Sequence, residues 1–153
     1  MIEKVILTAA AGYVGYLALK KGYDMTQDQV DYMARTIYGE ARGEGKKGMQ
    51  AVGNVIMNRV KKGGWYGASI KDVVLKPYQF SCWNDGDVNK TIITNATPAM
   101  LKQATAIAEQ VISGELPDIT GGATHYYAKT ISEPYWAKKM TQTAAIGNHI
   151  FYA

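Results

Sequence analysis

The chain has 153 residues, of which 47% are hydrophobic and 20% are charged, and its formal net charge is +4. This length predicts one domain that buries its own core, and the balance of apolar and charged residues excludes an intrinsically disordered chain. A mildly basic surface favours anionic partners, but the sequence contains neither a Lys/Arg block nor a nucleic-acid-binding motif, so no nucleic-acid partner is expected.

An apolar segment opens the chain, and residues 1–25 are assigned to this segment and a short linker. Residues 5–19 carry no charge, but they are fewer than the ~20 apolar residues of a typical transmembrane helix. Three interpretations remain open: an uncleaved signal-anchor associated with the inner membrane, an export signal, or a helix packed on the domain. The anchor is slightly favoured, although Lys20 and Lys21 would prefer the cytoplasmic side.

Two amphipathic helices are predicted in the next part of the chain. Thr26 and Gln29 form a capping box, and apolar residues then recur at helical spacing, which predicts a helix over residues 27–39. A second apolar stripe predicts a helix over residues 47–62, which ends at Gly63–Gly64. Both helices would bury one face in the core.

The middle of the chain alternates loops with short helical signals. Ser69 predicts the cap of a short helical turn. Residues 77–83 have no helical period and are predicted to be extended or an ordered loop, while residues 85–94 are rich in turn-forming residues. Thr97–Pro98 predicts the start of a further helix, which Gly114 ends.

Short strands are predicted in the last part of the chain. Residues 123–128 form a Tyr-bearing strand candidate that follows Gly121–Gly122. Residues 144–152 are predicted to form a final strand, or a hairpin that turns about Gly147–Asn148. Helices first and short strands later predict an α+β fold with a small antiparallel sheet near the C-terminus.

Glu40 is the principal candidate for a catalytic group. It lies three residues after Ile37 and seven after Met33, so it extends the apolar face of the first helix. A carboxyl group there would be partly removed from water and could stay protonated, as a general acid for glycosidic cleavage requires. Spacing alone favours the simpler alternative, a Glu that bonds to nearby backbone at a helix end.

Four blocks of sequence follow one another along the chain. They are YGEARGE and the residues that follow it in 38–60, YQFSCWN in 78–84, GGATHYY with PYWA in 121–137, and IGNHIFY in 146–152. Together they resemble the SleB-type cell wall hydrolase family, which includes the catalytic domain of spore cortex-lytic enzymes. The resemblance extends over residues 26–153, which are therefore assigned to a cell wall hydrolase catalytic domain.

The resemblance implies a lysozyme-like fold and cleavage of peptidoglycan glycan strands between N-acetylmuramic acid and N-acetylglucosamine. Family members typically act as lytic transglycosylases, in which one Glu protonates the leaving oxygen and then serves as base while a 1,6-anhydro ring closes. Glu40 matches that Glu, and neither a metal nor another cofactor is expected. A monomeric phage endolysin in the periplasm or cell wall is favoured, with a bacterial wall enzyme as the alternative source.

Substrate-binding residues are expected on two other segments. Gln79 and Ser81 would bond sugar hydroxyl or N-acetyl groups, or else cap the backbone of a loop. Thr124 and Tyr126 point the same way along a strand of period two, so both are expected to face the cleft while the next residue, Tyr127, faces the core.

Further side chains are expected to support the site. Trp136 is a platform for a sugar ring or a core residue, with neither favoured. Glu44 is expected to orient Arg42 or a backbone amide, and Arg42 would pair with a carboxylate or be solvated. Cys82 is predicted to be a small buried hydrophobe. Two histidines and one cysteine leave too few ligands for a typical zinc site.

Two functions of other classes remain open. A peptidoglycan amidase would need metal ligands or an activated nucleophile, which cannot be assembled from this sequence. A non-catalytic wall-binding module would use the same cleft without an active acid.

Overall fold

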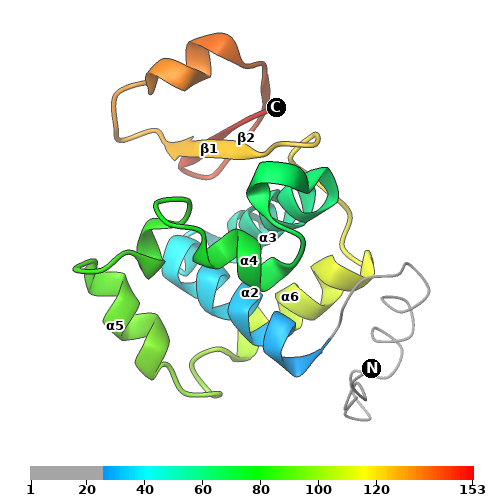
Figure 1. Ribbon diagram of the computed structural model, residues 1–153, viewed down its shortest axis with the longest axis vertical. Coiled ribbons are helices and arrows are strands. Elements are labelled where there is room, and N and C mark those ends of the chain that lie inside the picture. Colours follow the sequence, from blue (N-terminus) through cyan, green and yellow to red (C-terminus); the bar gives the residue numbers. More distant parts are fainter. Residues whose placement is uncertain (1–25) are drawn as a thin grey trace.

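The computed structural model describes residues 26–153, which form a helical body with a small sheet lying against one end of it (Figure 1). The apolar segment predicted over residues 5–19 lies outside the described residues, as does the linker after it. Within residues 26–153, no helix combines the length and apolarity needed to cross a membrane.

Within the described chain five helices come first and three strands last, which confirms the predicted α+β arrangement with a small antiparallel sheet near the C-terminus. The helices are α2 (Gln27–Ala41), α3 (Gly45–Lys62), α4 (Ile70–Leu75), α5 (Val88–Asn95) and α6 (Lys102–Ser113). Short 3₁₀ helices are η1 (Gly64–Tyr66), η2 (Ser81–Trp83) and η3 (Tyr135–Lys139). The strands are β1 (His125–Ala128), β2 (Gln142–Ile146) and β3 (His149–Tyr152).

Helix α2 runs through the centre of the helical body and contacts each of the other four helices (Figure 1). It begins where the sequence predicts, because the Thr26 hydroxyl accepts a hydrogen bond from the backbone N–H of Gln29 at 3.4 Å. Its predicted apolar stripe is buried. Gly53 of α3 allows a close approach, since a Cβ there would lie 3.3 Å from side-chain atoms of Ile37 and Val111.

Helix α5 corrects the prediction that residues 85–94 are turns. The Asp87 side chain accepts a hydrogen bond from the backbone N–H of Asn89 at 2.8 Å and caps the helix. Its sequence is rich in Thr, Ile and Asn, which have modest helix propensity, so local preference does not reveal the helix. The fully buried Ile93 packs against the core, and this tertiary contact decides the conformation.

Helix α6 begins later than predicted. The Thr97 hydroxyl does accept a hydrogen bond from the backbone N–H of Met100, at 3.3 Å, but residues 97–100 are exposed and lead through a turn into the helix. A shorter-range bond from the N–H of Lys102 to the carbonyl of Ala99 interrupts the helical ladder there. The predicted end is confirmed, because Gly114 takes the left-handed conformation with φ of 80°.

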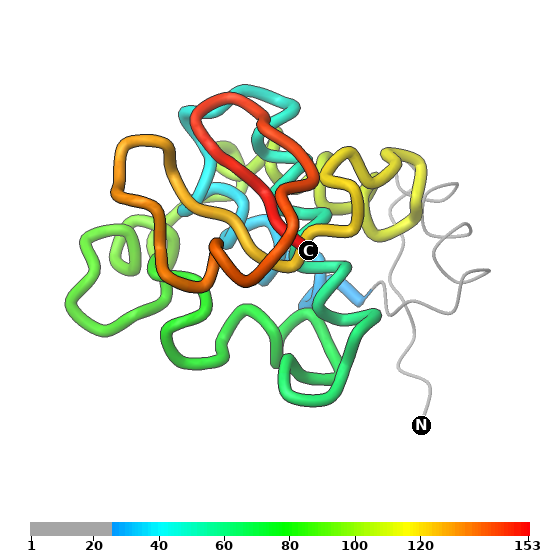
Figure 2. The backbone as a smooth tube through the Cα atoms, turned by 90° about the horizontal axis from the view of Figure 1, so that it is seen from above, coloured from blue at the N-terminus to red at the C-terminus, as the bar shows by residue number. Residues whose placement is uncertain are grey.

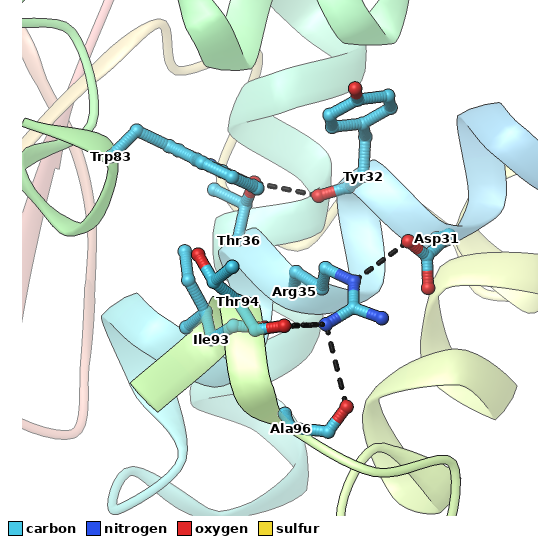
Figure 3. Close-up of polar contacts among 8 residues, drawn as sticks. All are labelled: Asp31, Tyr32, Arg35, Thr36, Trp83, Ile93, Thr94 and Ala96. Carbon is cyan, nitrogen blue, oxygen red and sulfur yellow. Dashed lines mark hydrogen bonds and ion pairs between the residues drawn. The ribbon is translucent and has the colours of Figure 1, made fainter. Parts of the chain in front are cut away.

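Polar contacts fasten the loop around η2 and the end of α5 to α2 (Figure 3). The Arg35 guanidinium pairs with Asp31 and donates to the backbone carbonyls of Ile93 and Ala96. The indole N–H of Trp83 donates to the Thr36 hydroxyl at 2.9 Å. The Trp83 bond holds η2 against α2 at Thr36, one helical turn before Glu40, and the Arg35 bonds hold the end of α5.

The three strands form one antiparallel sheet in the order β1-β3-β2. The predicted hairpin about Gly147–Asn148 is confirmed, and Gly147 supplies the positive φ of 56° that the turn requires. Tyr126 of β1 pairs with Phe151 of β3. Seen from above, the C-terminal strands overlie the helical body (Figure 2).

The two faces of the sheet differ in what they contact. Phe151 is fully buried in the core, and the Tyr126 ring lies 5.6 Å from it, on the face toward the helices. Tyr127 lies on the opposite face with Trp136 and Tyr152, which corrects the prediction that it faces the core. The side chains of β1 alternate between the two faces as the sequence predicts, but Tyr126 rather than Tyr127 packs on the core.

Candidate active site

Glu40 lies in the last turn of α2 and is half-buried. Gly39 precedes it at a crowded position, where a Cβ would lie 2.7 Å from the Cβ of Cys82 and 2.9 Å from Cγ2 of Ile93. The missing side chain at Gly39 lets η2 pack directly on α2. The Glu40 carboxyl group is thereby brought within hydrogen-bonding distance of the η2 backbone.

Three groups donate hydrogen bonds to the Glu40 carboxyl group. The Tyr126 hydroxyl donates to Oε2 at 3.0 Å, and the backbone N–H of Cys82 donates to Oε1 at 3.1 Å. The Ser81 hydroxyl lies at the limit of hydrogen bonding, 3.5 Å from Oε1. Donors from η2 and from β1 thus hold the carboxyl group from two sides.

The nature of these donors determines which oxygen can carry a proton. A backbone N–H can only donate, so Oε1 must remain an acceptor. A tyrosine hydroxyl can donate or accept, so the proton of a neutral Glu40 belongs on Oε2. Burial and the neighbouring Glu40 carboxylate raise the pKa of Tyr126 well above its usual value, so this hydroxyl keeps its own proton.

A shallow hollow of about 330 Å³ opens beside Glu40. It is lined by residues 39–44 at the end of α2 and by Asn89 of α5. The hollow is wide open, so it suits part of an extended polymer better than an enclosed small molecule. Glu40 therefore has both a partly buried carboxyl group and an open surface on which a substrate can lie.

Of the predicted substrate-binding residues, Ser81 and Tyr126 contact Glu40 directly. Gln79 is half-buried, and its Oε1 lies 3.4 Å from a guanidinium nitrogen of Arg59. Thr124 is buried, its hydroxyl lies 2.9 Å from Nδ1 of His125, and its carbonyl accepts from Arg59. Contact of these four residues with a substrate stays a prediction.

Trp136 lies apart from the Glu40 carboxyl group. Its ring centroid is 5.0 Å from that of His125 and 5.5 Å from that of Tyr152, on the face of the sheet opposite Tyr126. It is half-buried in this aromatic cluster. Its proposed stacking with a sugar ring stays a prediction, because the cluster also gives the ring a structural role.

Glu44 contacts a backbone amide, one of its two expected partners, and Arg42 is exposed and pairs with no carboxylate among the described residues. Both carboxyl oxygens of Glu44 accept from Asn148, Oε2 from the backbone N–H at 3.1 Å and Oε1 from the side-chain amide at 3.3 Å. The backbone hydrogen bond is the largest of several effects that together lower the pKa of Glu44. Arg42 donates to Asn89 Oδ1 at 2.9 Å and to carbonyls at the end of α2. Glu44 thus joins the helical body to the β2–β3 turn.

Arg59 is the site residue that sequence reasoning missed. Only 5% of its surface is exposed, and its guanidinium contacts both Thr124 and Gln79. A signal was present, because Arg59 lies three residues after Ile56 and seven after Val52 and so extends the apolar stripe of its helix. The backbone N–H of Cys82 could not be assigned a role from any residue pattern.

Cys82 is fully buried, as predicted, and burial is the main cause that raises the pKa of its thiol well above the usual value. His149 is buried on the inner face of the sheet, with its ring centroid 5.1 Å from that of Tyr126. Among residues 26–153, no group of three or more His, Cys, Asp or Glu side chains is arranged to hold a metal ion.

Comparison with known proteins gives matches over most of the described chain. A family model described as Cell Wall Hydrolase matches residues 43–152. Spore cortex-lytic enzymes from Halalkalibacterium halodurans and Bacillus cereus are 31% and 32% identical to this chain, each over 82% of it. The chain spans 35% and 44% of the length of these two curated relatives.

Two solved catalytic domains have a similar structure. The catalytic domain of the Bacillus cereus SleB protein is 30% identical, with a TM-score of 0.69 over 86% of this chain and 93% of that domain. The catalytic domain of the germination-specific lytic transglycosylase SleB from Bacillus anthracis is 29% identical, with a TM-score of 0.68 over 86% of this chain and 98% of that domain.

Proposed function

The chain belongs to the cell wall hydrolase family, and we propose that it cleaves peptidoglycan glycan strands as a lytic transglycosylase with Glu40 as general acid and base. The observation that carries this proposal is the Glu40 carboxyl group, held between the backbone N–H of Cys82 and the Tyr126 hydroxyl beside an open hollow. The name of the Bacillus anthracis relative supports the transglycosylase chemistry.

In the proposed first step the Glu40 carboxylic acid donates its proton to the oxygen that joins N-acetylmuramic acid to N-acetylglucosamine. The C1–O bond breaks, positive charge develops on the muramyl ring, and Glu40 becomes a carboxylate. The N–H of Cys82 and the Tyr126 hydroxyl then stabilise the new negative charge, because both can donate to it.

In the proposed second step the Glu40 carboxylate accepts the proton of the 6-hydroxyl group of the same muramyl sugar. The freed oxygen attacks C1 and closes a 1,6-anhydro ring, and Glu40 returns to its acid form. This sequence needs one carboxyl group and no water. The other carboxylate of the motif, Glu44, is engaged through both oxygens by Asn148, which supports a single-carboxyl mechanism.

We place this activity in the periplasm or cell wall, on vegetative peptidoglycan or on spore cortex as in the curated relatives. A monomeric endolysin tethered to the inner membrane through residues 5–19 is the corresponding proposal for the whole protein. Fractionation of cells before and after membrane depolarisation tests the tether, which fails if the protein is soluble in both samples.

The substitution Glu40→Gln tests the catalytic assignment. It removes the acid but keeps the size and one acceptor oxygen, so we expect lysis of purified sacculi to fall by about a hundred- to ten-thousand-fold with an unchanged melting temperature. Glu109→Gln is the matched control, because Glu109 is a half-buried carboxyl group on α6. Retention of activity in Glu40→Gln would refute the assignment.

Mass spectrometry of the released muropeptides tests the reaction type. The proposal predicts 1,6-anhydromuramyl ends. Reducing muramyl ends would instead indicate a hydrolytic muramidase, and free stem peptides would indicate an amidase. Binding to sacculi without any release would indicate a wall-binding module.

A further inference from the structure

Arg59 is a buried cation that lies behind the Glu40 site, in the last turn of α3. Its Nε donates to the carbonyl of Thr124 at 2.8 Å, and Nη1 donates to Oε1 of Gln79 at 3.4 Å. The guanidinium carbon also lies 4.8 Å from the ring centroid of Phe80 and 5.4 Å from that of Tyr66. One side chain therefore joins α3 to the two segments that border Glu40.

Within residues 26–153 the Arg59 guanidinium forms no direct ion pair with a carboxylate. Burial lowers the pKa of its guanidinium, but the group stays charged because arginine does not deprotonate in proteins. Glu40 is the carboxylate whose charge acts on it. A buried charge without a direct counter-ion is costly, so its presence at this place calls for a functional explanation.

The two segments that Arg59 joins are those that supply the Glu40 donors. Thr124 comes just before β1, which carries Tyr126, and Gln79 comes just before η2, which carries Ser81 and the N–H of Cys82. A shift of either segment would lengthen a hydrogen bond to Glu40. The fork of Arg59 is thus placed to set the spacing of the donors across the carboxyl group.

Arg59 also fixes the orientation of the Gln79 amide. A guanidinium has only donors, so the Gln79 oxygen must face it and the NH₂ group must point elsewhere. Gln79 is half-exposed at this position. Its NH₂ group can then donate to a carbonyl oxygen of a bound substrate, such as that of an N-acetyl group.

We propose that Arg59 is the positioning residue of the site: its fork sets the spacing of the Glu40 donors and presents the Gln79 NH₂ group to an acetamido carbonyl of the glycan. This inference rests on the proposed glycan-cleaving function. The positive charge of Arg59 adds a second effect, because it favours the carboxylate that forms when Glu40 gives up its proton.

Two substitutions separate the fork from the charge. Arg59→Lys keeps the charge but cannot donate to Thr124 and Gln79 in the same geometry. Arg59→Met removes both. The matched control is Arg35→Met, because Arg35 also donates to backbone carbonyls of another segment but contacts none of the Glu40 donors (Figure 3).

For Arg59→Lys we expect kcat on sacculi to fall by about ten- to a hundred-fold, because misplaced donors and substrate slow the chemical step. For Arg59→Met we expect a larger fall in kcat, because this variant loses the charge as well as the fork. Arg35→Met should keep the kcat of the unsubstituted protein in its folded fraction.

Binding to the glycan gives a readout that does not need cleavage. In the Glu40→Gln background, Arg59→Lys should weaken calorimetric binding of an uncleaved disaccharide-repeat fragment by about five- to tenfold, as expected for a lost hydrogen bond of about 1 kcal/mol. The inference is wrong if Arg59→Lys keeps full kcat and full binding. It is also wrong if Arg59→Met, like Arg35→Met, loses activity only in proportion to its unfolded fraction.

A different result would show that the proposed function itself is wrong. In that case the unsubstituted protein does not cleave sacculi, or Glu40→Gln cleaves them as fast as the unsubstituted protein does. Should Arg59→Met not fold, the Arg59→Lys measurements decide the inference alone.

Discussion

At the scale of single residues, the types of hydrogen-bond donor around Glu40 determine which protonation states its carboxyl group can adopt. Glu40 accepts one bond from a group that can only donate, the N–H of Cys82, and one from a hydroxyl that can do either, that of Tyr126. A carboxyl group surrounded only by N–H donors would be fixed as an anion. The Tyr126 hydroxyl allows both protonation states that the two proposed steps require.

Tyr126→Phe tests this role at the level of one oxygen atom. The ring and its packing on Phe151 are kept, but Oε2 of Glu40 loses its hydroxyl partner. We expect kcat on sacculi to fall by about tenfold with little change in KM, a change of about 1.4 kcal/mol in the barrier. Tyr127→Phe, on the other face of the same strand, is the control and should keep full activity. Equal activities in the two variants would contradict the assignment.

At the scale of secondary-structure elements, the site depends on the contact between α2 and η2. Gly39 makes this contact possible, because Cys82 and Ile93 occupy the space that a side chain at residue 39 would fill. The buried Cys82 side chain faces the helix while its backbone N–H reaches Glu40. Packing and hydrogen bonding at the site are therefore two results of one close approach.

Gly39→Ala should disturb stability and activity together. In an exposed helix this change stabilises by about 0.5 to 1 kcal/mol. Here the added Cβ would lie 2.7 Å from the Cβ of Cys82, so η2 must move, and we expect a net loss of about 1 to 3 kcal/mol in the free energy of unfolding. Gly43→Ala is the control, because no atom beyond the neighbouring residues of the chain lies within 4 Å of a Cβ at that position. Chemical denaturation measures the free energy of unfolding of the two variants, and equal values would show that η2 moves without an energetic cost.

At the scale of the whole molecule, the sheet lies against one end of the helical body (Figure 1), and the hydrogen bond from Tyr126 of β1 to Glu40 of α2 crosses this junction. The sheet supplies Tyr126, and the helices supply the carboxyl group. Glu44 joins the two parts at a second place, through Asn148 in the β2–β3 turn. Gly147 is close to this contact, since a Cβ there would lie 2.7 Å from Oε2 of Glu44. The sheet is thus bonded to the helical body at two places, through Tyr126 and through Asn148.

Glu44→Gln should lower stability in a pH-dependent way. The hydrogen bonds from Asn148 lower the pKa of Glu44 in the folded protein below its ordinary value of 4.5. A group whose pKa is lowered on folding stabilises the fold above the unfolded value, and this contribution is lost as pH falls through the folded value. The amide of Gln keeps only one acceptor, so we expect Glu44→Gln to lose about 1 kcal/mol at pH 7.

The difference in free energy of unfolding between Glu44→Gln and the unsubstituted protein should be constant above about pH 5.5 and should shrink as pH falls below 4.5, the ordinary pKa of a Glu side chain. Urea denaturation at a series of pH values measures this. Glu115→Gln, which changes an exposed carboxyl group, is the control. A difference that did not depend on pH would mean that Glu44 acts through packing rather than through its charge.

Local pattern alone determined α2, its start at Thr26, its buried stripe and the presence of Glu40 at its end. It also determined the hairpin at Gly147–Asn148 and the α+β order of the elements. These features follow from helical spacing, caps and turn chemistry, which act between residues close in sequence. The four sequence blocks that indicated the cell wall hydrolase family lie on these elements and on the loops between them.

Only the tertiary structure decided what surrounds Glu40. Its contacts with Cys82 and Tyr126 join residues 42 and 86 positions apart, and no local pattern specifies such distances. Helix α5 formed against its weak propensity because Ile93 is buried, and Arg59 became a site residue because folding placed it between two distant segments. Burial and long-range donors are properties of the packed molecule, so they appear only when α2, η2 and the sheet are brought together.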